Sequence, residues 1–208
     1  MAGSSAKAGI VVTLPKPSLD STHSIEKAIS NRRSVRNFSY GAVTLKDVSQ
    51  ILWAAQGITG KKKGYRAAPS AGASYPLMVY VVVGNVEGLS EGIYRYDPKK
   101  HELIQTGRKD VRKDLSSASF GQSCVAEGSV VIVFSAVYNR VTNRYGKRGV
   151  RYVDMEAGHA SENIYLQAES LGLSTVAVGA FTDKEVKKII GMPFEETPLY
   201  IMPIGKVE

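Results

Sequence analysis

Long apolar runs are the clearest pattern in this chain, and they predict strands. Residues 77–83 and 129–136 are apolar almost throughout, which is typical of strands covered on both faces. Weaker patterns predict strands at residues 92–97 and 102–106, which form a hairpin through Pro98. Two further strands are predicted at residues 174–179 and 200–204, and the last of these closes the sheet. An apolar piece at residues 10–12 is expected to pair with a strand or with a partner.

Apolar positions spaced three and four residues apart predict the helices. The best-marked helix follows a capping-box pattern of Thr44 and Asp47, runs to about residue 56 and ends at Gly57. Its buried face is expected to consist of Val48, Ile51, Leu52 and Ala55. Thr182 and Glu185 form a second capping-box pattern, so another helix is expected to start there.

The longest predicted helix covers about residues 151–171. Its less polar positions lie on more than one face: Met155, His159, Ile164, Leu166, Ala168 and Leu171. A helix wetted on one side shows a narrower stripe, so we expect burial on two sides and a packing role between subunits. Residues 108–120 predict another helix, and the basic residues 139–149 predict a mobile surface segment or lid. The irregular order of strands and helices favours one α+β domain.

Composition narrows the possible classes of function. The 208 residues are 43% hydrophobic, which suits one globular domain with a sizeable core, and the net charge is +8. The basic residues are dispersed, with no run longer than residues 61–63, which argues against a nucleic-acid partner. The single cysteine excludes an internal disulfide. Because no run has the length of a signal peptide or a membrane span, we expect a cytoplasmic protein with no membrane partner.

A cluster of arginines is the strongest candidate for anion binding. It follows a short helix that we expect to be capped by Ser24 and anchored by Ile25, Ala28 and Ile29. The cluster consists of Arg32, Arg33, Ser34 and Arg36. Forked guanidinium donors match phosphate oxygens and stay charged, so the cluster indicates a site for a terminal phosphate. The alternative is a solvated helix end, where arginines meet the last carbonyls.

A loop of small residues precedes the strand at 77–83. Seven of the eleven residues 66–76 are Ala, Gly or Ser, so the backbone is open to a docking ligand. Ser70 and Ser74 add hydroxyl groups. An ordinary tight loop is the alternative, but loops that flank a central sheet often carry binding residues.

The chain lacks the motifs of side-chain catalysis. It has no Gly-x-x-x-x-Gly-Lys-Ser/Thr loop, no Gly-x-Ser-x-Gly and no His-Glu-x-x-His. Cys124 has no nearby histidine, and His159, on a mostly apolar helix, is more typical of a satisfied core residue than of a ligand. An anion site without acid–base groups is consistent with a bound cofactor. Flavin mononucleotide (FMN) fits, with backbone N–H groups near Gly179 and Ala180 for its N5 and O4 atoms.

These motifs together resemble those of the nitroreductase-like FMN enzymes. Residues 32–38 are similar to the opening signature of that superfamily, and residues 69–76 to the second flavin loop of its peptide azoline oxidase (thiazole- and oxazole-forming dehydrogenase) branch. Residues 156–166 and 171–181 resemble the C-terminal half of that branch. The resemblance implies a nitroreductase-like α+β fold, with a mainly antiparallel sheet flanked by helices in an intertwined homodimer.

The resemblance also implies a domain division and a set of site residues. A flexible arm, residues 1–14, would precede a single FMN-binding domain, residues 15–208. Arg32, Arg33, Ser34 and Lys206 would hold the flavin phosphate, and Arg36 would reach the ribityl chain or the pyrimidine edge. Pro69, Ser70, Ala71, Gly72 and Ser74 would line the flavin from the partner subunit, and the backbone of Val178, Gly179 and Ala180 would touch N5 and O4.

Three functions remain open on the sequence. The first is a homodimeric oxidoreductase that passes hydride from NADH or NADPH through FMN to a small acceptor, such as a nitroaromatic or a quinone, by a ping-pong mechanism. The second is a peptide azoline oxidase that acts with a partner, although the chain shows no convincing counterpart of the Lys-Tyr pair of those enzymes. The third is a non-catalytic basic module that binds phosphate groups or nucleic acid. Ala73 also replaces an asparagine that plain nitroreductases usually carry in the second loop.

Overall fold

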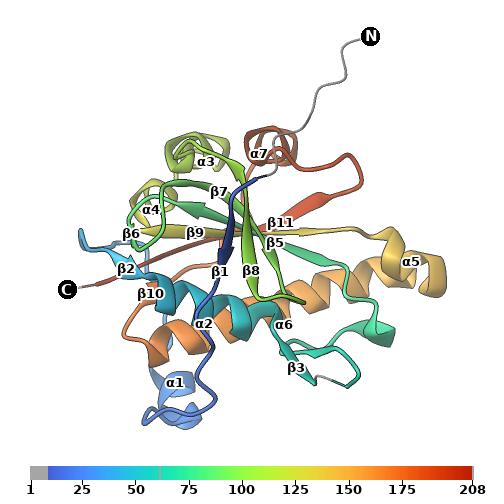
Figure 1. Ribbon diagram of the computed structural model, residues 1–208. Coiled ribbons are helices and arrows are strands. Elements are labelled where there is room, and N and C mark those ends of the chain that lie inside the picture. Colours follow the sequence, from blue (N-terminus) through green and yellow to red (C-terminus); the bar gives the residue numbers. More distant parts are fainter. Residues whose placement is uncertain (1–8, 61, 208) are drawn as a thin grey trace.

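The computed structural model describes residues 9–60 and 62–207, and within them a seven-stranded sheet carries helices on both faces (Figure 1). The strand order is β1-β8-β7-β5-β9-β11-β10, and every neighbouring pair is antiparallel. The strands of this sheet are β1 Val11–Thr13, β5 Leu77–Val83, β7 Gly92–Asp97, β8 Glu102–Gly107, β9 Val130–Ala136, β10 Ser174–Thr175 and β11 Thr197–Gly205. The predicted α+β class with a mainly antiparallel sheet is confirmed.

Two hydrophobic cores lie on the two faces of the sheet. Side chains alternate along β5, so Val79 and Val81 enter one core while Tyr80 and Val82 enter the other. Helices α2 and α6 cover the first core, and α3, α4 and α7 cover the second (Figure 1). The helices are α1 Ile25–Asn31, α2 Leu45–Gln56, α3 Arg112–Ala118, α4 Ser123–Glu127, α5 Asn139–Tyr145, α6 Arg148–Ser170 and α7 Asp183–Ile190.

The smaller elements connect these layers. They are the parallel pair β2 Val43–Thr44 and β6 Val86–Glu87, the hairpin β3 Ile58–Gly60 with β4 Tyr65–Arg66, and the single turn of 3-10 helix η1 Ala71–Ala73. In the N-terminal arm, β1 pairs with β8, as its apolar run predicted. Residues 1–8 of the arm and Lys61 of the basic run lie outside the described residues. No helix in residues 9–60 and 62–207 is long and apolar enough to span a membrane.

Helix α2 confirms its prediction in detail. The Thr44 hydroxyl accepts from the Asp47 backbone N–H at 3.1 Å, and the Asp47 carboxylate accepts from the Thr44 backbone N–H at 3.0 Å. This closed capping box satisfies donors that a helix start otherwise leaves open. The predicted apolar face is buried, and Gly57 ends the helix.

Helix α6 is buried on one side within the single chain, and the predicted burial of its other side between subunits stays a prediction. One broad face is buried against α2 and the sheet, but Met155 is 52% exposed and His159 is also exposed. His159 is therefore not a core histidine. A single chain supplies packing for one side of α6, and any cover for the other side must come from elsewhere.

Several boundaries also differ from the prediction, for local reasons. Helix α3 starts only at Arg112, where the Asp110 carboxylate accepts from the Arg112 backbone N–H at 3.0 Å. The expected lid at 139–149 instead forms α5 and the start of α6, because Val141 is fully buried. The expected strand at 174–179 shortens to β10, since the Ala177 N–H donates to the Tyr165 hydroxyl at 2.7 Å rather than to a strand.

The C-terminal prediction needs two further corrections. Strand β11 lies between β9 and β10 rather than at the edge of the sheet. Thr182 does precede α7, but its side chain makes no capping hydrogen bond, so the second capping box does not form.

Candidate functional site

The predicted phosphate-binding residues lie along one margin of the sheet. Helix α1 ends at Arg32, and the chain then runs beside the edge strand β10, with the Val35 N–H donating to the Thr175 carbonyl at 3.0 Å. Ser34 forms a parallel bridge with Thr175. Further on, the Ser39 N–H donates to the Lys206 carbonyl at 2.9 Å. The fold thus brings the arginine segment and Lys206, far apart in sequence, to the same margin.

Their side chains are only partly engaged within the chain. The Arg32 guanidinium lies 5.1 Å from the ring centroid of Tyr165 on α6, and its Nε is 3.9 Å from a Glu162 oxygen. The Ser34 hydroxyl is 3.0 Å from the Tyr165 hydroxyl. Arg33 donates to the carbonyls of Ser30 and Arg32 at 2.9 and 2.8 Å, as in the alternative of a helix-end arginine. Because all three side chains reach solvent, an incoming anion has access to them.

Residues 178–180 offer backbone donors next to this margin. Val178 pairs with Ile201 of β11, after which Gly179 and Ala180 are exposed. Across the described residues, the backbone N–H groups of Gly179 and Ala180 have no hydrogen-bond acceptor. The Ala180 carbonyl accepts from the Gln122 side chain at 3.1 Å. Free N–H groups at a fixed position suit a ligand oxygen or ring nitrogen.

Cys124 lies close enough to Arg36 to feel its positive charge. Cys124 is buried, and burial raises the pKa of its thiol, although the positive charge of Arg36 opposes that shift. A raised pKa keeps the group in the thiol form at neutral pH, so a nucleophilic role is disfavoured. Arg36 itself is exposed.

The small-residue loop at 69–76 is held in a strained backbone conformation. Ala73 and Tyr75 have φ of +54° and +46°, values that non-glycine residues rarely adopt. The Tyr75 N–H donates to the Ser70 hydroxyl at 2.8 Å, which fixes the loop. At Gly72 (φ +60°) an added Cβ would lie 2.6 Å from the Tyr145 hydroxyl, so a side chain there would strain the backbone and displace the Tyr145 side chain. Strain held by such contacts is common at ligand sites.

The loop and the arginine margin are separated within one chain. Helix α6 packs against η1 near Glu156, but it meets Arg32 and Ser34 at Glu162 and Tyr165. At 1.5 Å per residue, Glu156 and Tyr165 are about 14 Å apart along the helix axis. The predicted residues therefore form two groups, and one chain does not join them in a single pocket.

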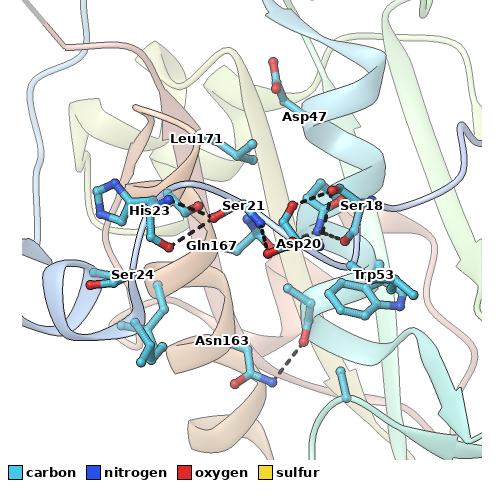
Figure 2. A pocket seen from close by; sticks show the side chains of 18 of the residues that line it. Ser18, Asp20, Ser21, His23, Ser24, Asp47, Trp53, Asn163, Gln167 and Leu171 are labelled. Carbon is cyan, nitrogen blue, oxygen red and sulfur yellow. Dashed lines mark hydrogen bonds between the residues drawn. The ribbon is translucent and has the colours of Figure 1, made fainter.

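A large cavity of about 680 Å³ is distinct from both groups (Figure 2). It opens between the segment at 18–25, α2 and α6, and polar contacts join the two helices beside it. Asn163 donates to the Ala54 carbonyl at 2.9 Å, and Gln50 donates to Gln167 at 3.0 Å. None of the residues predicted to bind a cofactor lines this cavity. Leu19, at its rim, is 82% exposed.

Sequence reasoning did not single out the buried carboxyl group of Glu156 as a site residue. It is 2% exposed, and in the described part of the chain neither of its oxygens has a hydrogen-bond partner. Burial raises the pKa of Glu156 to about 7, against the opposing effects of the nearby Ser70 and Arg66. Its place on the buried face of α6, three residues after Val153 and four before Ala160, was a signal available in the sequence.

The remaining titratable groups do not form acid–base machinery. His101, in the turn between β7 and β8, lies 2.8 Å from both the Ser49 hydroxyl on α2 and the Tyr96 hydroxyl on β7, so it joins this hairpin to α2. Burial lowers its pKa. The structured ranges 9–60 and 62–207 hold no cluster of His, Cys, Asp and Glu that could bind a metal ion.

Comparison with known proteins gives the class. The model of the nitroreductase family matches residues 29–206, nearly the whole chain. The chain therefore belongs to the nitroreductase family, and it is an oxidoreductase of that family.

Individual relatives agree with this assignment. MJ1384 of Methanocaldococcus jannaschii, a nitroreductase by name, is 43% identical over 88% of this chain and 90% of its own. A crystal structure of a protein described as a nitroreductase, from Ralstonia eutropha, superposes with a TM-score of 0.85 at 28% identity, covering 97% of this chain and 94% of the other. The microcin B17-processing protein McbC of Escherichia coli is 27% identical over 68% of this chain and 54% of its own. The predicted superfamily and fold are thus confirmed, and the relatives include a peptide-processing protein.

Proposed function

We propose that the protein is an FMN-dependent oxidoreductase that transfers hydride from NADH or NADPH through the flavin to a small acceptor, such as a nitroaromatic or a quinone. The observation that supports this most directly is the arginine margin beside β10, with free backbone donors at Gly179 and Ala180 close to it. Membership of the nitroreductase family supports the oxidoreductase class. FMN, when bound, supplies the hydride acceptor, and ping-pong kinetics follow if donor and acceptor use one face of it in turn.

The residues present fit FMN without help from a side-chain base. Arg32, Arg33, Ser34 and Lys206 would hold the terminal phosphate by charge-assisted hydrogen bonds. The N–H groups of Gly179 and Ala180 would orient the ring, since they have no acceptor of their own within the described residues. Arg36 would stabilise negative charge on the reduced ring by Coulomb attraction. The loop at Pro69, Ser70, Ala71, Gly72 and Ser74 would lie against the ring face.

We further propose that the flavin is shared between two chains of a homodimer. The loop and the arginine margin meet α6 about 14 Å apart along its axis and do not share a pocket within one chain. In the proposed dimer, the loop over the ring comes from the partner chain. Ile25 and Ile29 of α1 are 55% and 60% exposed, and Met155 of α6 is 52% exposed. Only Ala28 of the apolar face predicted to anchor α1 is buried. An apolar surface of this kind is typical of a protein–protein interface.

The test is to identify the cofactor and its reaction. We expect mass spectrometry of the purified protein to find FMN rather than FAD. Anaerobic NADH or NADPH is expected to bleach the flavin band near roughly 450 nm, because hydride transfer reduces the ring. Double-reciprocal plots with a quinone acceptor should be parallel. Absence of flavin would contradict the proposal, and intersecting lines would contradict the shared face.

A second candidate is favoured by one observation, the match to McbC. We propose as the alternative a peptide azoline oxidase, which acts on a peptide with a partner cyclodehydratase. A flavin that co-purifies but is bleached by neither nicotinamide would favour this alternative. Genes for a cyclodehydratase next to the gene of this protein would favour it further.

A further inference from the structure

The central sheet forks at one end. Strands β5 and β7 pair from Val83↔Gly92 to Tyr80↔Arg95, and the pairing stops there. Beyond that point, residues 77–79 pair with β9, while Tyr96 and Asp97 pair with β8. A cavity of about 450 Å³ opens in this fork, bounded also by the end of α2, the loop at 74–75 and Arg140 of α5.

The lining of this fork cavity is strongly basic. Four cationic side chains, Arg66, Arg95, Lys99 and Arg140, face a single acid, Asp97. In the described ranges, none of the five belongs to a salt bridge; the ion pairs found there are Arg32–Glu162 and Arg112–Asp110. Three guanidinium groups and an ammonium group outnumber the nearby acids, which are Asp97 in the lining and Glu156 near Arg66. They form a site for an anion, because their mutual repulsion falls when an anion binds.

Two of the arginines are held in place by the strained loop. The Arg66 guanidinium lies 4.6 Å from the Tyr75 ring centroid and donates to the Gln56 side chain at 2.7 Å. Arg140 donates to the Tyr75 carbonyl at 3.0 Å. Burial lowers the pKa of Arg66, which means that its charge is incompletely solvated. Donors fixed in advance lose little entropy when a ligand arrives.

We propose that the fork cavity binds the phosphate group of a small molecule. A net lining charge of about +3 and forked donors match a phosphate monoester or diphosphate better than a single carboxylate. A volume of 450 Å³ holds a ligand of nucleotide or sugar-phosphate size. Arg32, Arg33 and Lys206 do not line it, so it is a second anion site, separate from the proposed flavin phosphate site.

The position of the cavity connects it with the proposed function. Ser74 and Tyr75 line the cavity and belong to the loop proposed to lie against the flavin. If that assignment holds, on which this step rests, the phosphate group belongs to a substrate whose reactive end lies over the ring. Two sources share this chemistry: the 2′-phosphate of NADPH, and a phosphorylated electron acceptor.

Two neighbouring lysines provide a matched test. Lys99 and Lys100 are exposed in the same turn, but Lys99 lines the cavity and Lys100 does not. Pyrophosphate is titrated by calorimetry into the full-length protein saturated with FMN, and into protein without FMN if none binds. We expect Lys99→Glu and Arg95→Ala to weaken pyrophosphate binding about 10-fold each, and Lys100→Glu to change it less than about twofold. The proposal would be overturned if Lys99→Glu and Lys100→Glu weakened pyrophosphate binding equally, or if neither substitution changed it.

The source of the phosphate is decided by a separate measurement. If it belongs to NADPH, Arg95→Ala raises KM for NADPH about 10-fold and leaves KM for NADH unchanged. If it belongs to the acceptor, the variant loses pyrophosphate affinity but treats both nicotinamides alike. Because pyrophosphate binding is measured directly, it can succeed where hydride transfer fails, so failure of the proposed function and failure of this site are distinguishable.

Discussion

At the scale of single residues, the described part of the chain keeps a carboxyl group where water does not reach it and no hydrogen-bond partner satisfies it. Glu156 is 2% exposed, and both of its oxygens lack partners among the residues that the structure describes. A buried carboxyl group without hydrogen bonds favours its neutral form, since desolvation penalises the charge. Burial accordingly raises its pKa to about 7. This places a proton-holding group beside the loop of Ser70, close to the proposed flavin position.

Glu156 therefore predicts a specific pH dependence of stability. Below pH 4.5 the carboxyl group is protonated in both the folded and unfolded chain. Between pH 4.5 and about 7 the unfolded chain loses the proton first, so the free energy of unfolding falls as pH rises and then levels off. A shift from 4.5 to about 7 corresponds to about 3 kcal/mol. Glu156→Gln should stabilise the protein by up to about that amount at pH 8 and by little at pH 5.

Urea denaturation of both proteins at the two pH values measures this difference. Comparing variant with wild type removes the contribution of His101, whose lowered pKa makes stability fall as pH drops below its ordinary value of 6.5. Glu169→Gln is the control, because Glu169 lies on the same helix but is partly exposed. If Glu156→Gln gives the same difference at pH 5 and pH 8, the carboxyl group is not the source of the effect.

At the scale of elements, local signals were reliable where the chain satisfies them locally. The capping box of Thr44, the apolar runs of β5 and β9 and the hairpin of β7 and β8 needed no knowledge of distant contacts. Predictions failed where a distant side chain intervened. The Tyr165 hydroxyl accepts a hydrogen bond from the Ala177 N–H, so β10 is shorter than predicted. The segment expected to be a lid forms α5, in which Val141 is buried. The fork between β5 and β7 was likewise hidden, because strand pairing is a property of the whole sheet.

The two capping-box sequences allow a matched prediction. Thr44 makes both reciprocal bonds at the start of α2, whereas the Thr182 side chain makes none at the start of α7. We expect Thr44→Ala to reduce the free energy of unfolding by about 1 kcal/mol, because a backbone donor loses its acceptor. Thr182→Ala should reduce it by less than about 0.5 kcal/mol. Thermal and urea unfolding measure both, and equal losses would show that the side-chain bonds at Thr44 do not stabilise the helix.

At the scale of the whole molecule, the candidate site residues form two groups that contact α6 at different positions along its axis. The arginine segment and the small-residue loop were both predicted from the sequence, and the structure brings Lys206 to the first of them. The separation of the arginine segment from the loop could not be predicted from the sequence, because it depends on where each of them packs along α6. The exposed Ile25, Ile29 and Met155 support the proposal that a second chain completes the site.

A shared site makes a prediction that a site within one chain does not. Arg32→Ala removes a proposed phosphate contact, and Gly72→Val strains the loop, because Gly72 has a φ of +60° and an added Cβ would displace the Tyr145 side chain. Each variant alone is expected to bind FMN at least about 10-fold more weakly.

In a homodimer with sites formed between chains, a mixed dimer has one site that carries both changes and one that carries neither. Equal co-expression should therefore restore about one quarter of the wild-type sites, half of the dimers being mixed. The two variants carry different affinity tags, which identify mixed dimers. Flavin fluorescence titration of the whole dimer mixture, before any selection for both tags, measures the recovered fraction. If light scattering shows mixed dimers but no tight FMN binding returns, the flavin is held within single chains and the division of the site along α6 has another explanation.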